Sequence, residues 1–401
     1  MLYNMQLFWP QGDAQEEERT QVELIVSLEE ERTQVELIVS LDEACKAALE
    51  GRIVPEWPNT LSTSFGLDSC PYYVMENHYI TAPLSPEEAA FPLAYAMAIG
   101  EDFETFERLF RAIYMPQNVY CVHIDKAAPL LFKMAVIELL SCFSNTFLSS
   151  QSEYVIHGGI SRLQAVLACM KDLLGSQVQW RYVINTCGHD FPLKTNREIV
   201  RYLKTLKGQN VTPRMLPVRK LATRVRYVHR PHRTSSHAFL RQRRLRKSPP
   251  PKELQIHFGS MYVALTRKFV HFALFDKRAT ELLSWSQDTY GPDEHFWITL
   301  NKIPDAPGSM AQEVPAASLR AVKWMFQEET HKGCHGHYWQ GMCVYGPGDL
   351  KWLYESPSMF ANKLQLEAYP LTVECLELRI RERMLNQSEV PVQLDWYLLP
   401  K

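Results

Sequence analysis

The alternation of short apolar runs with helical stretches between residues 91 and 185 most limits the folds open to this chain. Apolar, β-rich runs occupy residues 91–99, 119–125, 146–148 and 181–185. The stretches between them have helical spacing of apolar residues, at 103–114, 130–140 and 161–174. Strands that alternate with helices predict an α/β fold with a parallel sheet, because parallel strands need a crossover connection.

Polar residues follow two of these expected strands. Asp125 ends the second strand, and residues 187–190 (Cys-Gly-His-Asp) follow the fourth. Ligands of such sheets bind beyond the carboxyl ends of the strands. We therefore expect a nucleotide-type α/β unit, although the chain has neither a Gly-x-Gly-x-x-Gly motif nor a P-loop.

Residues 288–297 (Asp-Thr-Tyr-Gly-Pro-Asp-Glu-His-Phe-Trp) predict a helix that begins with two adjacent carboxylates. Gly-Pro ends the preceding structure, and Pro at a first helical position favours a helix start. Glu294 then lies in the first turn, where it can act as a general base if it faces a pocket. Alternatively, Asp293 and Glu294 only complement the helix dipole. The local pattern leaves both interpretations open.

Composition restricts the class of protein but not its compartment. The 401 residues are 46% hydrophobic and 22% charged, as in ordinary globular proteins, and allow one large domain or two medium ones. The net charge of -2 argues against a general polyanion binder. Nine cysteines without a Cys-x-x-Cys motif disfavour zinc-ribbon and thioredoxin folds. They fit either a reduced core or four disulfides with one free thiol.

The start of the chain differs from the rest. Residues 16–28 (EEERTQVELIVSL) are repeated unchanged at 29–41, which is a local duplication, so residues 1–44 are treated as an appendage. Residues 1–10 have too short an apolar run and no basic residue for a secretory signal. No segment reaches the roughly 18 consecutive apolar residues of a membrane span.

A basic block lies in the middle of the chain. Residues 214–252 contain thirteen Lys or Arg and no Asp or Glu, which predicts a solvated loop. The run 241–247 also fits a nuclear or nucleic-acid-binding patch. No aromatic-interleaved module surrounds it, so we expect no nucleic-acid partner.

Several segments read together resemble the core 2/I-branching β-1,6-N-acetylglucosaminyltransferases, glycosyltransferase family 14. They keep a consistent order over about residues 42–385 and are 91–95, 108–118, 120–125, 185–196, 259–262, 288–297 and 360–363. The resemblance implies a GT-A-type α/β fold, with a mixed central sheet flanked by helices and stapled by disulfides. It divides the chain into the appendage 1–44, a stem-like lead-in 45–90, a catalytic domain 91–385 and a C-terminal tail 386–401.

The resemblance implies inverting transfer of GlcNAc from UDP-GlcNAc to O6 of a GalNAc or galactose residue, on an O-glycan or poly-lactosamine acceptor. Glu294 would be the catalytic base. No metal cofactor is implied, and the chain has no Asp-x-Asp clamp. Cationic side chains must then stabilise the leaving diphosphate. Lys363 matches one of them, but Gln340 occupies the position of the expected Arg.

Other site residues are carried over from the same resemblance. Asp125 would contact the ribose or uracil, and three further donor-side positions, where the family has other residues, hold Ala98, Gly100 and His157. The acceptor-binding residues would be Lys220, Arg224, Trp324 and Phe326. These departures and Gln340 keep a second function open, that of a catalytically weak or inactive relative that binds the sugar or nucleotide.

The resemblance also implies a cysteine pairing, with Cys187 left free and the pairs Cys45–Cys375, Cys70–Cys142, Cys121–Cys169 and Cys334–Cys343. Such pairing favours a secretory lumen. The family implies a Golgi membrane enzyme with its catalytic domain on the lumenal side, although no signal anchor is visible in this sequence.

Overall fold

The computed structural model describes residues 40–52, 57, 70–214, 219–233, 238–251, 254–309, 319–393 and 396. The chain forms two units, Met1–Ala44 and Cys45–Lys401. Helix α2 (Leu41–Leu49) begins in the first unit, and the duplicated segment of that unit lies outside the described residues except for Ser40 and Leu41. The sheets and the site described below belong to the second unit.

A five-stranded sheet forms the centre of the second unit, in the order β3-β2-β1-β4-β8. Its strands are β1 (Leu93–Ile99), β2 (Val119–Ile124), β3 (Thr146–Leu148), β4 (Tyr182–Cys187) and β8 (Ala264–Thr266). The first four are parallel, and β8 pairs antiparallel with β4. The mixed α/β fold class is thus confirmed, although strand–helix alternation alone predicted only the parallel part.

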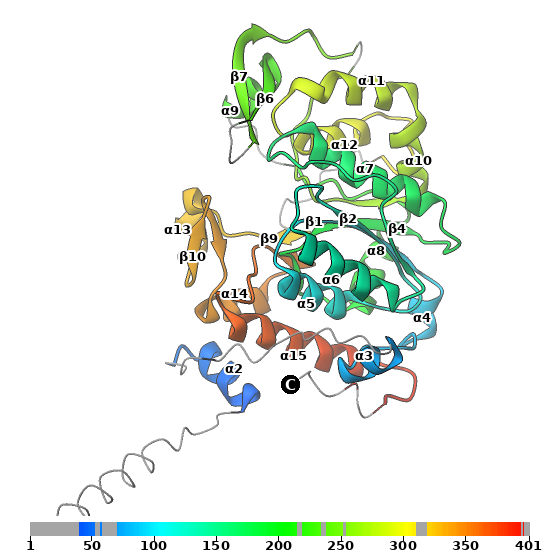
Figure 1. Cartoon of the computed structure of the whole chain (residues 1–401), viewed down its shortest axis with the longest axis vertical. Helices are drawn as coiled ribbons and strands as arrows, with labels where there is room; N and C mark the ends of the chain where they lie inside the picture. Colours follow the sequence, from blue (N-terminus) through cyan, green and yellow to red (C-terminus); the bar gives the residue numbers. More distant parts are fainter. Residues whose placement is uncertain are drawn as a thin grey trace, which may run out of the picture. The chain divides into compact units, whose positions relative to one another are not determined.

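Alternate residues of β1 face two different cores, because successive side chains of a strand point to opposite faces. Tyr95 and Met97 pack with α5 (Phe103–Ile113) and α6 (Leu130–Ser141). Ala94 and Ala96 pack with the helices of the other face, which are α7 (Ile160–Leu174), α10 (Arg267–Phe275), α11 (Lys277–Trp285) and α12 (Asp293–Asn301). Figure 1 shows these two helical layers on either side of the sheet.

Shorter elements complete the fold. Within the described residues, the other α-helices are α3 (Cys70–Glu76), α4 (Pro86–Ala89), α8 (Asn196–Thr205), α9 (Arg219–Arg226), α13 (Glu328–His331), α14 (Leu350–Glu355) and α15 (Pro370–Asn386). A three-stranded sheet comprises β5 (Phe191–Pro192), β12 (Phe360–Ala361) and β9 (Arg320–Ala321). Two hairpins are formed by β6 (Tyr227–Arg233) with β7 (Ala238–Arg246), and by β10 (His337–Trp339) with β11 (Met342–Val344).

Two expectations about local structure are corrected. Pro292 is the N-cap of α12 rather than its first residue. The basic block at 214–252, expected to be a solvated loop, instead forms α9 and the β6–β7 hairpin. Cross-strand backbone pairing, such as that of Tyr227 with Arg246, satisfies polar groups that a loop would leave to water.

Helix α15 is held against α5 by buried ion pairs. Glu377 lies 2.6 Å from Arg108 and 2.7 Å from Arg111, and none of the three side chains is more than 3% exposed. Burial opposes ionisation of Glu377, but the two guanidinium groups outweigh it and hold its pKa at about 2. Removing one partner would leave an uncompensated buried charge, so charge pairing helps to set the position of α15.

All four implied cysteine pairs are present as disulfides, and Cys187 is free. Among the described residues, no helix has the length and apolar character needed to cross a membrane. The implied domain boundaries remain predictions.

Replacing Cys45 and Cys375 by Ser should lower the free energy of unfolding by about 2–5 kcal/mol, because this disulfide joins residues 330 apart and strongly restricts the unfolded chain. Urea denaturation of the oxidised protein measures the loss. The matched control replaces Cys334 and Cys343, which are only 9 residues apart and should contribute about half as much in the same model. Equal losses for the two pairs would contradict the loop-closure explanation.

Candidate functional site

The carboxyl edge of the central sheet brings together three of the predicted donor-side residues. Ala98 is in register with His123 of β2 and Cys187 of β4. The backbone N–H of Asp125 donates to the carbonyl of Ile99 at 2.8 Å. A Cβ on Gly100 would lie 3.1 Å from that of Asp125, so glycine permits this close approach.

Residues 155–162 connect Asp125 to the segment that precedes Glu294. The N–H of Val155 donates to Oδ1 of Asp125 at 3.3 Å. Three residues later, the carbonyl of Gly158 accepts a bond from the N–H of Gly291 at 2.7 Å. Gly158 has φ +71, and a Cβ there would meet the ring of Tyr290 at 2.8 Å, so both backbone and space require glycine.

His157 lies on this connecting segment, between the contact with Asp125 and the contact with Gly291. Burial, together with the nearby Arg162, lowers the pKa of His157, which keeps the imidazole neutral at pH 7. A neutral ring offers one hydrogen-bond donor and one acceptor. The position suits recognition of a base or sugar better than neutralisation of a diphosphate.

Glu294 lies in the first turn of α12 and pairs with Arg224 of α9. Its side chain is 22% exposed. Burial raises the pKa of Glu294, and Arg224 opposes that increase. An ordered, partly accessible carboxylate whose pKa is raised toward neutrality has the properties of a general base.

The neighbouring Asp293 is turned to a different partner. It forms an ion pair with Arg162 of α7, and its side chain is only 5% exposed. Both acids lie in the first turn, where they complement the helix dipole. Of the two, Glu294 has the greater access to a substrate.

Lys363 is held at the same carboxyl edge by its chain neighbours. The side chain of Asn362 donates to Asp190 at 2.9 Å, and the N–H of Leu364 donates to the carbonyl of His189 at 3.0 Å. The ammonium group of Lys363 lies 4.0 Å from the centroid of the Trp339 ring. The cation is therefore directed toward the β10–β11 hairpin.

Gln340 is exposed in the turn of that hairpin, directly after Trp339. Gln340 and Gly341 both have positive φ, +51 and +80, as the two central residues of a type I′ turn require. Lys363 and Gln340 are thus brought to one hairpin from distant parts of the sequence. A residue other than glycine at position 340 must tolerate this left-handed backbone.

Two of the predicted acceptor-side residues lie beside this hairpin. Trp324 forms an antiparallel bridge with Met342, and its ring centroid is 5.8 Å from that of Phe326. Phe326 is 77% exposed and Trp339 is 44% exposed, so aromatic faces are available to a sugar. Arg224 lies at Glu294 instead, and the side chain of Lys220 falls outside the described residues.

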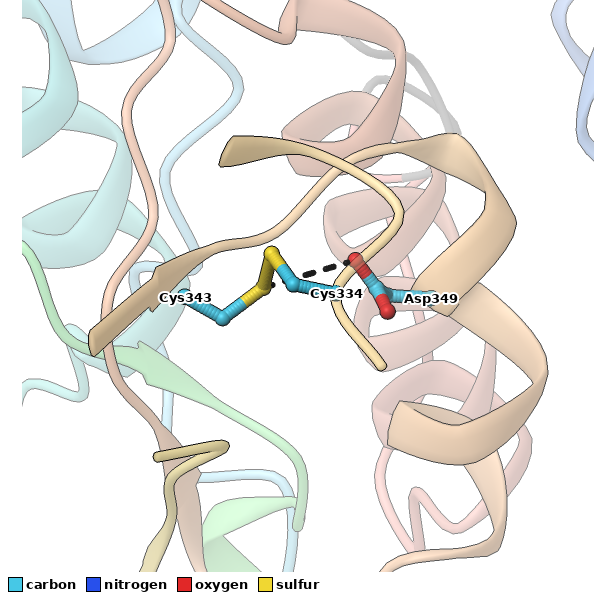
Figure 2. A group of neighbouring side chains, drawn as sticks. All are labelled: Cys334, Cys343 and Asp349. Carbon is cyan, nitrogen blue, oxygen red and sulfur yellow. Dashed lines mark hydrogen bonds between the residues drawn. A yellow bond between two sulfur atoms is a disulfide. The ribbon is translucent and has the colours of Figure 1, made fainter. Parts of the chain in front are cut away.

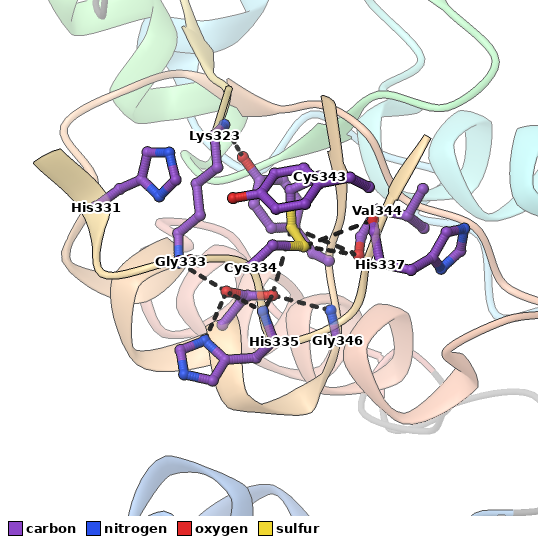
Figure 3. The surroundings of a disulfide bond; sticks show 12 residues. Lys323, His331, Gly333, Cys334, His335, His337, Cys343, Val344 and Gly346 are labelled. Carbon is purple, nitrogen blue, oxygen red and sulfur yellow. Dashed lines mark hydrogen bonds and ion pairs between the residues drawn. A yellow bond between two sulfur atoms is a disulfide. The ribbon is translucent and has the colours of Figure 1, made fainter. Parts of the chain in front are cut away.

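Cys334, Cys343 and Asp349 form a compact group with the spacing of a metal site (Figure 2). The two cysteines are joined in a disulfide, so neither supplies a thiolate ligand. Asp349 is fully buried and accepts bonds from Lys323 at 2.7 Å and from the N–H of His335 at 3.1 Å (Figure 3). The group fixes the base of the hairpin and is not a metal centre.

Cys187, the free thiol, lies at the end of β4. Burial, with Asp190 nearby, raises its pKa to about 11, so it remains a protonated thiol at pH 7. Tyr262 donates to its sulfur at 3.4 Å and Asn362 at 3.2 Å. Its environment suits a structural group next to the Lys363 segment rather than a nucleophile.

Sequence reasoning missed three residues of this region: Arg162, Tyr290 and Trp339. Arg162 is 131 residues from its partner Asp293, so no local pattern reveals the pair. Tyr290 packs on Gly158 and under Arg224, whose guanidinium lies 5.0 Å from the ring centroid. Tyr290 and Trp339 did have a local signal, the first as an aromatic residue just before the Gly-Pro break and the second as an aromatic residue beside a hairpin turn.

Comparisons with known proteins identify the family of the chain. A family model described as Core-2/I-Branching enzyme matches residues 93–354. The N-acetyllactosaminide β-1,6-N-acetylglucosaminyl-transferase of Homo sapiens is 57% identical over 355 residues, 88% of each chain. The probable β-1,3-galactosyl-O-glycosyl-glycoprotein β-1,6-N-acetylglucosaminyltransferase 7 of Sus scrofa is 46% identical, covering 82% of this chain and 77% of that protein. The human enzyme numbered 3 in the same series is 39% identical, covering 80% and 75%.

Proposed function

Since the chain belongs to the core-2/I-branching enzyme family, as a β-1,6-N-acetylglucosaminyltransferase, we propose that it transfers GlcNAc from UDP-GlcNAc to O6 of an acceptor sugar. The observation that carries the proposal is the continuous connection from Asp125 through residues 155–162 to Glu294. Asp125, the proposed donor-binding carboxylate, and the turn before Glu294, the proposed base, both contact this one short segment.

Poly-lactosamine is the acceptor that we place first. The relative at 57% identity is named for N-acetyllactosaminide, whereas that at 46% is named for galactosyl-O-glycosyl-glycoprotein. The exposed rings of Phe326 and Trp339 offer apolar faces on which a sugar ring can pack. We therefore place galactose of poly-lactosamine first and GalNAc of an O-glycan second.

The proposed reaction is a single inverting displacement. Glu294 removes the proton from the O6 hydroxyl, whose oxygen forms a bond to the anomeric carbon of GlcNAc. The bond from that carbon to UDP breaks on the opposite face, and the leaving diphosphate takes the electron pair. Lys363 stabilises the developing negative charge, with a neutral hydrogen bond from Gln340. The proposed step needs no metal, because cationic and amide side chains fill the role of the clamp.

Transfer assays test this proposal directly. The oxidised protein would be incubated with radiolabelled UDP-GlcNAc and a panel of poly-lactosamine and galactosyl-GalNAc acceptors, and the linkage of the product determined. A β-1,6-linked GlcNAc supports the proposal. UDP-GlcNAc binding without transfer to any acceptor would instead support the second candidate, a catalytically weak or inactive relative, which the uncharged Gln340 favours.

Replacing Gln340 by Arg is expected to raise kcat, by up to about 10²-fold, because one charged donor near the leaving diphosphate has an effect of that order. Backbone strain should change little, since Gln and Arg both carry a Cβ and meet the same steric cost at this positive φ. Initial rates at saturating UDP-GlcNAc provide the measurement, and Gln340→Lys tests whether charge alone suffices. An unchanged rate for both variants would mean that another group already fills the role.

We further propose a lumenal, Golgi location. Four disulfides suit an oxidising compartment better than the cytosol. Glycan acceptors are met in the same compartment. Immunolocalisation of the endogenous protein, with thiol labelling before and after reduction, tests both parts.

A further inference from the structure

The β6–β7 hairpin carries an unusual concentration of exposed positive charge. Six arginines of the hairpin and the preceding residue are exposed: Arg226, Arg230, Arg241, Arg243, Arg244 and Arg246. Residues 214–252 contain no Asp or Glu. Within the described part of the chain, none of these six guanidinium groups forms an ion pair. The hairpin thus presents cations that no carboxylate of the described residues neutralises.

The strand register sets two of these arginines directly opposite each other. Arg230 of β6 stands directly opposite Arg241 of β7, and His232 stands opposite Phe239. Side chains two residues apart on a strand share a face, so the arginine pair and the aromatic pair are neighbours. Phe239 is 43% exposed, and its ring centroid lies 5.2 Å from that of His232. Like charges directly opposite each other destabilise a sheet, and an anion bound between them would relieve that repulsion.

The hairpin is fixed beside the proposed catalytic base. Helix α9, which leads into β6, carries Arg224, the partner of Glu294. At the other end, Lys247 pairs with Asp288, and its N–H donates to the carbonyl of Arg226 at 2.9 Å. Figure 1 shows β6 and β7 extending from the region of α9 and α12. A glycan chain with one sugar at Glu294 therefore lies within reach of the arginine-rich face.

We propose that this face of the hairpin binds anionic substituents, sulfate esters, on the acceptor glycan a few sugars from the reacting residue. The inference rests on the proposed transferase function. Arginine offers planar, paired donors that match the oxygens of sulfate, and Phe239 supplies an apolar face for the adjoining sugar ring. The hairpin would make the enzyme prefer sulfated poly-lactosamine over the neutral chain.

The position of the hairpin favours an acceptor glycan over other polyanions. Phe239 and the arginine pair are neighbours on a hairpin that follows Arg224, the partner of Glu294, and the whole chain has a net charge of only -2. A general polyanion binder would instead be strongly basic overall. Preferential binding to nucleic acid or to an anionic membrane is the alternative result that the test can give.

The test compares a poly-lactosamine oligosaccharide sulfated on its GlcNAc residues with the neutral oligosaccharide of equal length. For the unaltered protein, kcat/KM should be about 3- to 10-fold higher with the sulfated chain, the range expected for two exposed charge pairs, and the advantage should shrink as salt is added. Arg230→Ala with Arg241→Ala should remove that preference. The matched control is Arg181→Ala with Lys268→Ala, which also removes two exposed positive charges. These residues lie near the amino end of β4, away from the carboxyl edge that carries the proposed site, so the control should retain the preference.

Binding measurements keep this inference separable from the proposed function. Calorimetry with the Glu294→Gln protein reports affinity for both oligosaccharides without turnover. One outcome is that the unaltered protein shows no transfer while the sulfated chain still binds more tightly than the neutral chain in a way that depends on Arg230 and Arg241. In that case the transferase proposal fails and the anion site stands. Equal affinity for the two chains, or equal loss in the control, would overturn the inference. So would tighter binding to single-stranded DNA or to phosphatidylserine vesicles than to the sulfated chain.

Discussion

Replacing Glu294 by Gln is expected to lower kcat for GlcNAc transfer by about 10²- to 10⁴-fold, the usual contribution of a positioned general base. The amide has nearly the same shape but cannot take the proton of the acceptor hydroxyl. UDP-GlcNAc binding should be largely retained, because Glu294 is assigned to the acceptor and not to the nucleotide. Radiolabelled transfer rates and calorimetric titration with UDP-GlcNAc measure the two effects separately.

The matched control for this change is Glu281→Gln on α11, whose side chain is 50% exposed. It removes one carboxylate at a distance from the site and should leave the rate unchanged. If Glu294→Gln transfers at the rate of the unaltered protein, the assignment of the base is wrong. If both UDP-GlcNAc binding and folding are lost, Glu294→Asp shows whether a displaced carboxylate restores part of the activity.

The dependence of kcat/KM on pH provides a second test of the role of Glu294. Burial raises the pKa of Glu294 from its usual value, although Arg224 opposes the increase. The base must be ionised to act, so kcat/KM should fall as the pH decreases through this raised pKa. The decline should therefore begin at a higher pH than an ordinary glutamate would produce. The residual activity of Glu294→Gln should not show that acid limb.

Lys363→Ala is expected to lower kcat by about 10²- to 10³-fold, because a fixed charge at the developing diphosphate would be lost. The loss should be severe here since Gln340, the other residue assigned to that role, is uncharged. Lys363 is only 7% exposed, so its cation acts in surroundings that screen it poorly. Single-turnover rates with bound UDP-GlcNAc separate this effect on chemistry from one on donor affinity.

Two further variants show whether the loss of kcat in Lys363→Ala comes from the lost charge. Lys363→Arg keeps the charge and should retain more activity than Lys363→Ala. Lys351→Ala removes an exposed lysine of α14 and should have no effect. If Lys363→Ala keeps full activity, another group stabilises the diphosphate. If the double variant Lys363→Ala with Gln340→Arg recovers activity, both residues act at the leaving group.

The central strands and helices were predictable because apolar periodicity is a local property of the chain. β3 was expected at 146–148 and lies at Thr146–Leu148, and α5 was expected at 103–114 and ends at Ile113. β8 was not predicted, because its antiparallel pairing with β4 is a tertiary contact that leaves no local pattern. The basic hairpin was misread for a related reason, since charge density describes exposure but not backbone pairing.

Some candidate site residues could likewise be identified from the sequence, whereas the contacts between them could not. Glu294 could be singled out from a Gly-Pro break followed by two acids, and Asp125 from its place at a strand end. No sequence signal shows that Asp293 is bound by Arg162 while Glu294 keeps access to a substrate. The contact between Lys363 and Trp339 is equally hidden, because it depends on how two separate segments meet.

By itself, the sequence determined the order of the main strands and helices, the membership in a glycosyltransferase family that its collinear motifs imply, and the identity of the groups available for chemistry. Only the tertiary structure decided which groups meet, since contacts between distant segments depend on packing and strand register. Packing connects Asp125 to the segment before Glu294, and register sets Arg230 opposite Arg241. A local sequence pattern carries information about the backbone over one or two turns, whereas a site is assembled across hundreds of residues.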